Sequence, residues 1–149
     1  MQDFFYFWHM TEPIKIKVEA LVNADIDLVW QAWTSAEHII HWNFASPDWH
    51  CPKASIDLRV GGLNFTRMEA KDGSFGFDFN CTYEQVEDNK RLVSSMEDGR
   101  KTEVTFDAQE GAVLVTEIFD TENQNPIEMQ QMGWQSILNN FKSYVEQMQ

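Results

Sequence analysis

The sequence predicts an α+β fold in which a seven-stranded, antiparallel, curved sheet wraps around a long carboxy-terminal helix, with two short helices after the first strand. Three observations support this prediction. Residues 55–120 show a period-two apolar pattern broken by turn signals, residues 126–148 carry an apolar stripe at helical spacing, and one alternating segment opens the pattern at residues 14–22. An apolar sheet face and an apolar helix stripe must each be buried, so we expect the two to face one another.

The first part of the chain predicts a strand and two short helices. Residues 14–22, IKIKVEALV, alternate apolar and polar side chains, which indicates a strand. Residues 23–35, NADIDLVWQAWTS, place apolar residues at helical spacing, with aspartates near the start, where the helix dipole favours negative charge. Residues 35–42, SAEHIIHW, begin with Ser35 as a candidate N-cap and predict the second helix.

Turn signals rich in Gly, Asp and Asn then separate six expected strands that can form an antiparallel meander. These strands are residues 55–60, 63–70, 74–86, 90–96, 102–109 and 112–120. The third strand contains FGFDFNCTY, in which the apolar side chains share one face and Gly, Asp, Asn and Thr share the other. The apolar face is made by Phe75, Phe77, Phe79, Cys81 and Tyr83.

The last helix has a well-marked start. In NPIE, Asn125 is the expected N-cap, Pro126 the first helical residue and Glu128 the partner in a capping box, and the helix should run to about Gln147. Its interior Gly133 costs about 1 kcal/mol relative to Ala, so we expect it to allow a close approach or to leave space beside Trp134. The apolar stripe is Trp134, Ile137, Leu138, Phe141, Tyr144, Val145 and Met148.

Length and composition predict one domain. The chain has 149 residues, 43% of them hydrophobic, which suffices for a single core. We interpret residues 10–149 as that domain and residues 1–9 as an amino-terminal extension. The extension contains the aromatic run FFYFW, which we expect either to pack on its own domain or to form a homodimer, because such a run is adhesive in water.

Charge and cysteine content exclude several classes of partner. The chain has 24 acidic and 11 basic side chains, a formal net charge of −13, which excludes nucleic acid binding. No apolar stretch approaches the roughly 20 residues that span a bilayer, so no membrane insertion is expected. Two cysteines, Cys51 and Cys81, are too few for a disulfide scaffold and are typical of reduced thiols in a cytoplasmic protein.

Residues 42–52, WNFASPDWHCP, form an expected loop with unusual aromatic content. Loops are usually polar, so this one should cover something: we expect Phe44 and Trp49 to turn inward, either as the wall of a cavity or as simple core packing. His50 and Cys51 are adjacent and point in opposite directions in an extended segment, which disfavours a catalytic dyad. His38 and His41 share a helical face without zinc-site spacing, so neither a metal nor another cofactor is expected.

Three charged residues share the alternation of apolar neighbours. Arg67 and Glu69 follow the parity of Leu63 and Phe65, and Glu117 follows the parity of the valines in VLVTEIF. This parity predicts that all three side chains enter the interior, where burial without partners is costly. They could form an internal salt bridge, or they could orient a ligand and supply an acid or base.

The order of elements resembles the helix-grip fold of the START and Bet v 1-like (SRPBCC) superfamily. Three segments resemble the AHSA1 family, which is related to the carboxy-terminal half of the activator of the Hsp90 ATPase. They are VNADIDLVWQAWTSAEHIIHW, the stretch from WNFASPDWHCP to CTYEQV with its DLRVGG motif, and GWQSILNNFKSYVE. The similarity extends over residues 14–147. Relatives with this architecture include lipid carriers, hormone receptors, polyketide cyclases and co-chaperones, so the resemblance implies the fold more closely than the function.

We therefore expect a protein that binds a small hydrophobic or aromatic molecule in a cavity between sheet and helix, rather than an enzyme. A cyclase- or hydrolase-like enzyme using polar groups in that cavity is one alternative, and a co-chaperone-like partner protein is the other. No catalytic residue is assigned. The expected cavity residues are Phe44, Trp49, Phe77, Phe79, Tyr83, Trp134, Leu138 and Phe141, with Arg67, Glu69 and Glu117 as polar contacts.

Overall fold

The computed structural model describes residues 13–149. The expected association or packing of residues 1–9 therefore lies outside the described residues. No helix among residues 13–149 is long and apolar enough to cross a membrane.

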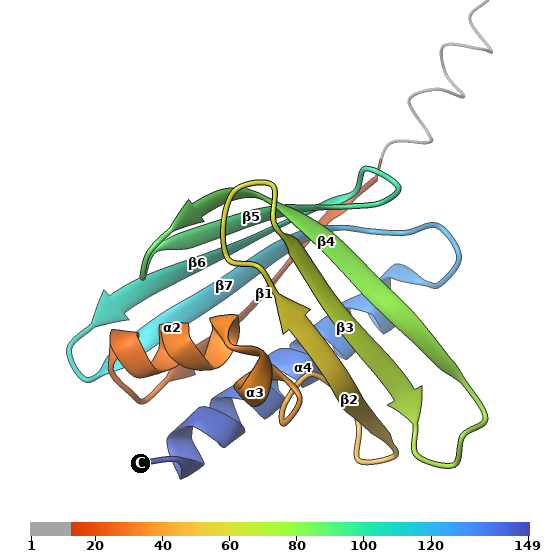
Figure 1. Ribbon diagram of the computed structural model, residues 1–149. Helices are drawn as coiled ribbons and strands as arrows, with labels where there is room; N and C mark the ends of the chain where they lie inside the picture. Colours follow the sequence, from red (N-terminus) through yellow and green to blue (C-terminus); the bar gives the residue numbers. More distant parts are fainter. Residues whose placement is uncertain (1–12) are drawn as a thin grey trace, which may run out of the picture.

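Seven antiparallel strands form one curved sheet that wraps around the carboxy-terminal helix, which confirms the predicted fold (Figure 1). Along the sheet the strand order is β1-β7-β6-β5-β4-β3-β2, so the first strand pairs with the last. The elements are β1 Lys15–Val22, α2 Ile26–Thr34, α3 Ala36–Ile39, β2 Trp49–Ile56, β3 Leu63–Ala70, β4 Gly76–Glu87, β5 Arg91–Met96, β6 Lys101–Gln109, β7 Ala112–Asp120 and α4 Ile127–Gln147.

Aromatic side chains of α2, α4 and the segment after α3 pack together in the core at one end of the sheet. Phe141 of α4 is fully buried there, and its ring centroid lies 4.8 Å from those of both Trp33 and Trp42. Trp42 Nε1 donates a hydrogen bond of 3.0 Å to the Ala32 carbonyl oxygen, so its polar edge is satisfied inside the core. The aromatic segment that follows α3 is thus anchored at its first residue.

The prediction for the second strand was wrong in its position. β2 begins at Trp49, inside the segment expected to be a loop, and residues 57–62 form the turn instead. Pro52 argues against a strand in the sequence, because proline lacks the backbone N–H that a strand donates to its neighbour. In the structure Pro52 lies on the edge strand of the sheet, where the pairing register with β3 shifts between His50 and Lys53. The turn requires glycine at Gly61, which has a φ of +84°.

The predicted capping box of the last helix was also wrong. Pro126, with a ψ of 146°, precedes the helix as its N-cap residue and makes no side-chain capping bond. The Asn125 carboxamide donates to Glu122 Oε2 at 2.9 Å instead, which removes it as a cap. Gln130 ties this turn together: its Nε2 donates to the Asn125 carbonyl at 2.8 Å, and its Oε1 accepts from the Glu122 amide at 3.0 Å.

Candidate functional site

A partly open pocket lies between the inner face of the sheet and α4. Its volume is about 670 Å³, within the range of roughly 300–1,000 Å³ that is typical of small-molecule sites. Strands β3 to β7 form one wall, residues 42–46 and Trp49 border it, and Gly133, Trp134 and Ile137 of α4 form the opposite wall. Most of the lining is aromatic or aliphatic, so the pocket offers an apolar surface to a guest.

The pocket exists because α4 does not fill the space above the sheet near Gly133. Within residues 13–149, no heavy atom outside the α4 backbone near Gly133 and its two chain neighbours lies within 4 Å of the position that a Cβ at Gly133 would occupy. The neighbouring Trp134 ring lies flat on Phe119, with centroids 3.9 Å apart and an interplanar angle of 8°. A ring stacked in this way covers the sheet and leaves space beside it.

The aromatic residues expected in the cavity occupy different depths of this pocket. Phe44, Trp49 and Phe79 are half-buried, and Phe77 is more exposed, at the rim, with its ring centroid 6.0 Å from that of Trp49. Tyr83 is buried, and its hydroxyl accepts a hydrogen bond of 3.1 Å from Asn64 Nδ2. Burial raises the pKa of Tyr83 to about 12, so this hydroxyl stays protonated at neutral pH.

Leu138 and Phe141 were expected in the cavity lining but lie in the solid core. Both are completely buried, and neither lines the pocket. They belong to the same apolar stripe of α4 as Trp134, but they lie further along the helix, where α2 and α3 close the fold. The apolar stripe defines one face of α4, and only the part of that stripe nearer the start of the helix lines the pocket.

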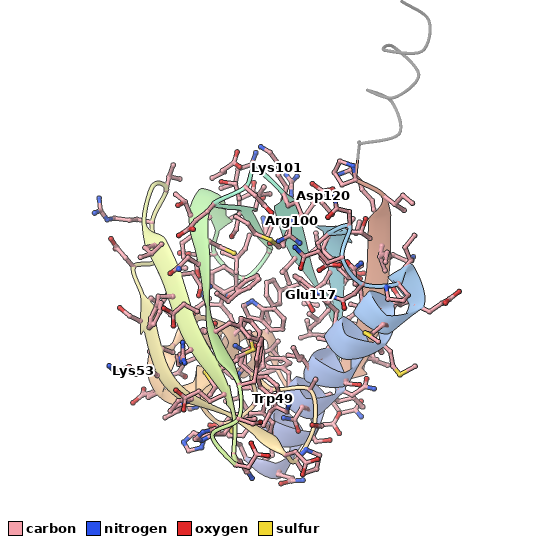
Figure 2. All side chains as sticks on the ribbon, turned by 90° about the vertical axis from the view of Figure 1, so that its right-hand side faces the viewer. Trp49, Lys53, Arg100, Lys101, Glu117 and Asp120 are labelled. Atoms are coloured by element: carbon pink, nitrogen blue, oxygen red, sulfur yellow. The ribbon has the colours of Figure 1, made fainter. Side chains whose placement is uncertain are left out.

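Glu117 lies deep in the pocket on the inner face of β7 (Figure 2). Its neighbours in register are Val18 of β1 and Val104 of β6, and only 7% of the residue is exposed. Within residues 13–149, burial alone shifts the pKa of its carboxyl group, with no contribution from a hydrogen bond or an ion pair. Burial raises the pKa of Glu117 to about 8, because an apolar surrounding disfavours the charged form. The group is therefore mostly a neutral carboxylic acid at pH 7.

A few other polar groups reach the same pocket from the sheet. Thr66 Oγ1 is the one buried side-chain polar atom without a hydrogen-bond partner in the described part of the chain. Ser94 and Thr102 also line the pocket. Arg100 lies toward one end, and its Nε donates to Asp98 Oδ2 at 2.7 Å (Figure 2). An unpartnered buried hydroxyl is costly, so Thr66 and Glu117 both leave hydrogen-bonding capacity for a guest.

Arg67 and Glu69 do not enter the interior, so the predicted parity of β3 was wrong. Arg67 Nε donates to Glu69 Oε2 at 2.9 Å, and Arg67 Nη1 donates to Asp78 Oδ1 at 3.1 Å. This salt bridge lies on the outer face, where both side chains are about one third exposed and cover Gly76 of β4. The inward residues of β3 are instead Asn64, Thr66 and Met68, which line the pocket.

The residues of β3 that face the pocket could have been recognised from the pairing of β3 with β4 in a hairpin. The tight turn after Ala70 places Arg67 opposite Asp78 and Thr66 opposite Phe79. Opposite residues in an antiparallel pair share a face, so the apolar face of β4 selects Thr66 and not Arg67. The sequence pattern of β3 alone indicated the wrong inward face, because Leu63 and Phe65 are large apolar residues that lie on the outer face, where Leu63 is 49% exposed.

The outward position of Arg67 makes a simple prediction. Substituting Arg67→Met should leave the affinity of the pocket for an apolar ligand unchanged, because the guanidinium contacts only carboxylates on the outer face. Titration of wild type and variant with the same apolar ligand checks this. A marked loss of affinity in the variant would place the guanidinium inside the pocket.

His38, His41, His50 and Cys51 each have a structural partner. His38 Nδ1 and the Tyr144 hydroxyl form a hydrogen bond of 2.7 Å, and His41 stacks on the same ring. Cys51 is buried and donates to the Lys53 carbonyl at 3.4 Å, whereas His50 lies 3.6 Å from Glu69 on the outer side. Among residues 13–149, no group of three His, Cys, Asp or Glu side chains is placed to hold a metal ion.

A second hollow of about 850 Å³ lies outside the sheet–helix interface. It is lined by Pro13, Ile14, the turn at residues 98–100 and the segment 121–127 that leads into α4. These are turn and loop residues, and the aromatic side chains that line the first pocket are not among them. The sheet–helix pocket, with its apolar walls and buried acid, is therefore the candidate site.

Comparison with known proteins gives one family. The model of a family described as activator of Hsp90 ATPase homolog 1-like protein (AHSA1) matches residues 23–146. Among solved structures, an AHSA1-like protein from Aeromonas hydrophila is 46% identical, with a TM-score of 0.85, and the match covers 91% of this chain and 94% of that one. A protein from Cytophaga hutchinsonii is 47% identical over 90% of this chain and 93% of that one, with a TM-score of 0.77.

A more distant structure supports the fold alone. A protein from Nitrosomonas europaea is 19% identical, with a TM-score of 0.80 over 91% of this chain and 96% of that one. No curated protein matches the chain.

Proposed function

Because the chain belongs to the AHSA1 family of START-like domains, we propose that it binds a small hydrophobic or aromatic molecule in the pocket between the sheet and α4. Family membership supports a ligand-binding domain in general. The pocket supports the finer proposal, since it combines a suitable volume, mostly apolar walls and a small number of polar groups. The single observation that carries the proposal is the space that Gly133 leaves beside Trp134.

The walls of the pocket suit a ring system of moderate size. A buried aromatic group removes roughly 150–250 Å² from water. At about 25 cal/mol per Å², this burial contributes roughly 4–6 kcal/mol before the costs of ordering are subtracted. Even before those costs, apolar contact alone would thus give dissociation constants of roughly tens of micromolar to one millimolar, and tighter binding needs a polar contact.

Tryptophan fluorescence is a direct test of this proposal, because Trp33, Trp42, Trp49 and Trp134 all line the pocket. Titration with 2-(1-naphthyl)ethanol, a neutral aromatic compound, should give saturable quenching and raise the melting temperature as the ligand concentration increases. A panel of naphthyl and aliphatic alcohols that neither quenches nor stabilises the protein would contradict the proposal, provided that native mass spectrometry shows the purified protein to be free of bound molecules.

Acid–base catalysis on the bound molecule is a second candidate function, and one observation favours it. Glu117 is a buried carboxylic acid whose pKa of about 8 is close to physiological pH, as general acids often require. If the pocket is an active site, turnover of an apolar ester or ketone should be lost in Glu117→Gln while binding of the neutral alcohol is kept. Equal turnover in both proteins would exclude Glu117 as the acid. The co-chaperone role, the homodimer and the cytoplasmic location stay predictions.

A further inference from the structure

The deepest polar group of the pocket is an acid without a partner. Glu117 comes from the central part of β7, and the residues beside it in register, Val18 and Val104, offer only methyl groups. No charged side chain of α4 lines the pocket, whose lining from this helix is Met129, Gln130, Gly133, Trp134 and Ile137. Since buried carboxyl groups normally have partners, the position is suited to a partner that a ligand supplies.

The other charged side chains that line the pocket are already engaged. Asp78 borders the pocket between Phe77 and Phe79, but its carboxylate accepts a hydrogen bond from Arg67 on the outer face, and Arg100 donates to Asp98. Glu122 Oε1 accepts from the backbone amides of Gln124 and Asn125. Among the charged groups that line the pocket, Glu117 alone lacks a partner within residues 13–149.

The electrostatic surroundings favour a cation as that partner. The guanidinium of Arg100 lines the pocket but is paired with the Asp98 carboxylate, so its positive charge is balanced without Glu117. The whole chain carries a formal net charge of −13, which attracts cations to its surface. The aromatic rings of the lining add faces that attract an ammonium group when they are shielded from water.

From this geometry we propose that the ligand of the pocket carries a basic nitrogen, as a protonated aliphatic amine attached to an apolar or aromatic body, with the ammonium group on the Glu117 carboxylate. The proposal rests on the binding function stated above and names its ligand class. The apolar body lies between the sheet and α4, and the ammonium group supplies the counter-ion that the protein does not.

A pH dependence follows from the proton on Glu117. Its pKa of about 8 means that the empty pocket holds a carboxylic acid at pH 6–7, so the amine must displace one proton when it binds. The titratable pocket groups facing from β4, Cys81 and Tyr83, have pKa values that burial raises to about 12, so they stay protonated throughout this range. Affinity for an amine should rise about tenfold between pH 6 and pH 7 and level off above pH 8.

A neutral hydrogen-bond acceptor, such as a carbonyl group, would give the opposite dependence. It would accept the proton of the neutral acid, so its affinity would be constant below about pH 8 and fall above it. The sign of the pH dependence therefore separates the two kinds of ligand. It is measured on the wild-type protein and needs no substitution.

The test compares 2-(1-naphthyl)ethylamine with its isosteric alcohol, 2-(1-naphthyl)ethanol, by calorimetry on the full chain at about pH 6 to pH 9. We expect the amine to bind at least about tenfold more tightly than the alcohol at pH 8, and to release about one proton per ligand at pH 6.5 in buffers of different ionisation heat. Glu117→Gln should abolish the preference for the amine and leave alcohol binding intact. Glu103→Gln makes the same replacement of a carboxyl group by an amide at a residue that pairs with Arg91 and does not line the pocket, and should keep the preference.

Each other outcome has a definite meaning. If the alcohol binds and the amine binds no better, or if the preference survives in Glu117→Gln, the amine proposal is wrong and the binding function stands. The amine proposal is also wrong if the affinity for the amine falls between pH 6 and pH 8. If neither compound binds, the binding function fails together with this inference.

Discussion

Replacing Glu117 by glutamine should make the protein more stable than wild type at pH 8 and should remove a loss of stability that the wild type shows as the pH rises. The folded-state pKa of about 8 lies above the ordinary value of 4.5, so protonation favours the folded state. Between these two values the unfolded chain has released a proton that the native protein still holds. The free energy of unfolding of the wild type should therefore fall by up to about 1.4 kcal/mol per pH unit in this window, a total of several kcal/mol.

Urea unfolding at intervals between about pH 5 and pH 9 measures this effect. The carboxyl groups of Asp72, Glu84, Asp98 and Glu146 have lowered pKa values because of hydrogen bonds and ion pairs, so their contribution is lost at more acidic pH and does not overlap the window. Glu103→Gln serves as the control for net charge and should follow the wild-type slope. Parallel curves for wild type and Glu117→Gln would mean that the Glu117 carboxyl is solvated and not buried.

Substituting Gly133→Phe should abolish binding without unfolding the protein. The new ring would occupy the empty space beside Trp134, and no other segment of residues 13–149 has an atom within 4 Å of its Cβ. Because glycine costs about 1 kcal/mol in a helix interior, the substitution also removes a local destabilisation. We expect the affinity for an aromatic ligand to fall at least about tenfold, which is 1.4 kcal/mol of binding free energy, while the melting temperature is not lowered.

Gly133→Ala is the matched control for this substitution. It adds one methyl group, gains about 1 kcal/mol in helix propensity, which is more than phenylalanine gains at the same position, and leaves most of the pocket open. Fluorescence titration of the three proteins with 2-(1-naphthyl)ethanol separates the effects. Tight binding by Gly133→Phe would show that the ligand occupies another part of the molecule.

The fold could be predicted because its signals are local and repeated. The alternation of β4 from Phe75 to Tyr83 and the stripe of α4 each define one face without any knowledge of the rest of the chain. The strand that begins at Trp49 was missed because it is defined by its pairing with β3, which includes a register shift around Pro52. That pairing depends on the tertiary structure and not on the local sequence. Sequence propensity treats proline as a break, and an edge strand tolerates it.

The site could be predicted only in part, because a pocket depends on the fit between elements. Glu117 was identified from parity within one strand, and the structure places it on the inner face. Arg67 and Glu69 were misplaced because parity within β3 is ambiguous when apolar residues lie on both faces, and only the pairing with β4 resolves it. Whether Trp134 fills the cavity or lies flat on Phe119 depends on packing between α4 and β7, which no single segment encodes.

Backbone NMR of the full chain, titrated with 2-(1-naphthyl)ethanol, would show directly where an apolar molecule binds. Binding in the pocket should shift the amide signals of inward residues from several strands together with those of α4, above all Thr66, Phe79, Glu117, Gly133 and Trp134. The outer-face residues Arg67 and Glu103 should change little. Shifts confined to the second hollow around Asp98 and Asn123, or to the exposed apolar residues Val60 and Leu63, with the signals of Glu117 and Gly133 unchanged, would contradict a binding site between the sheet and α4.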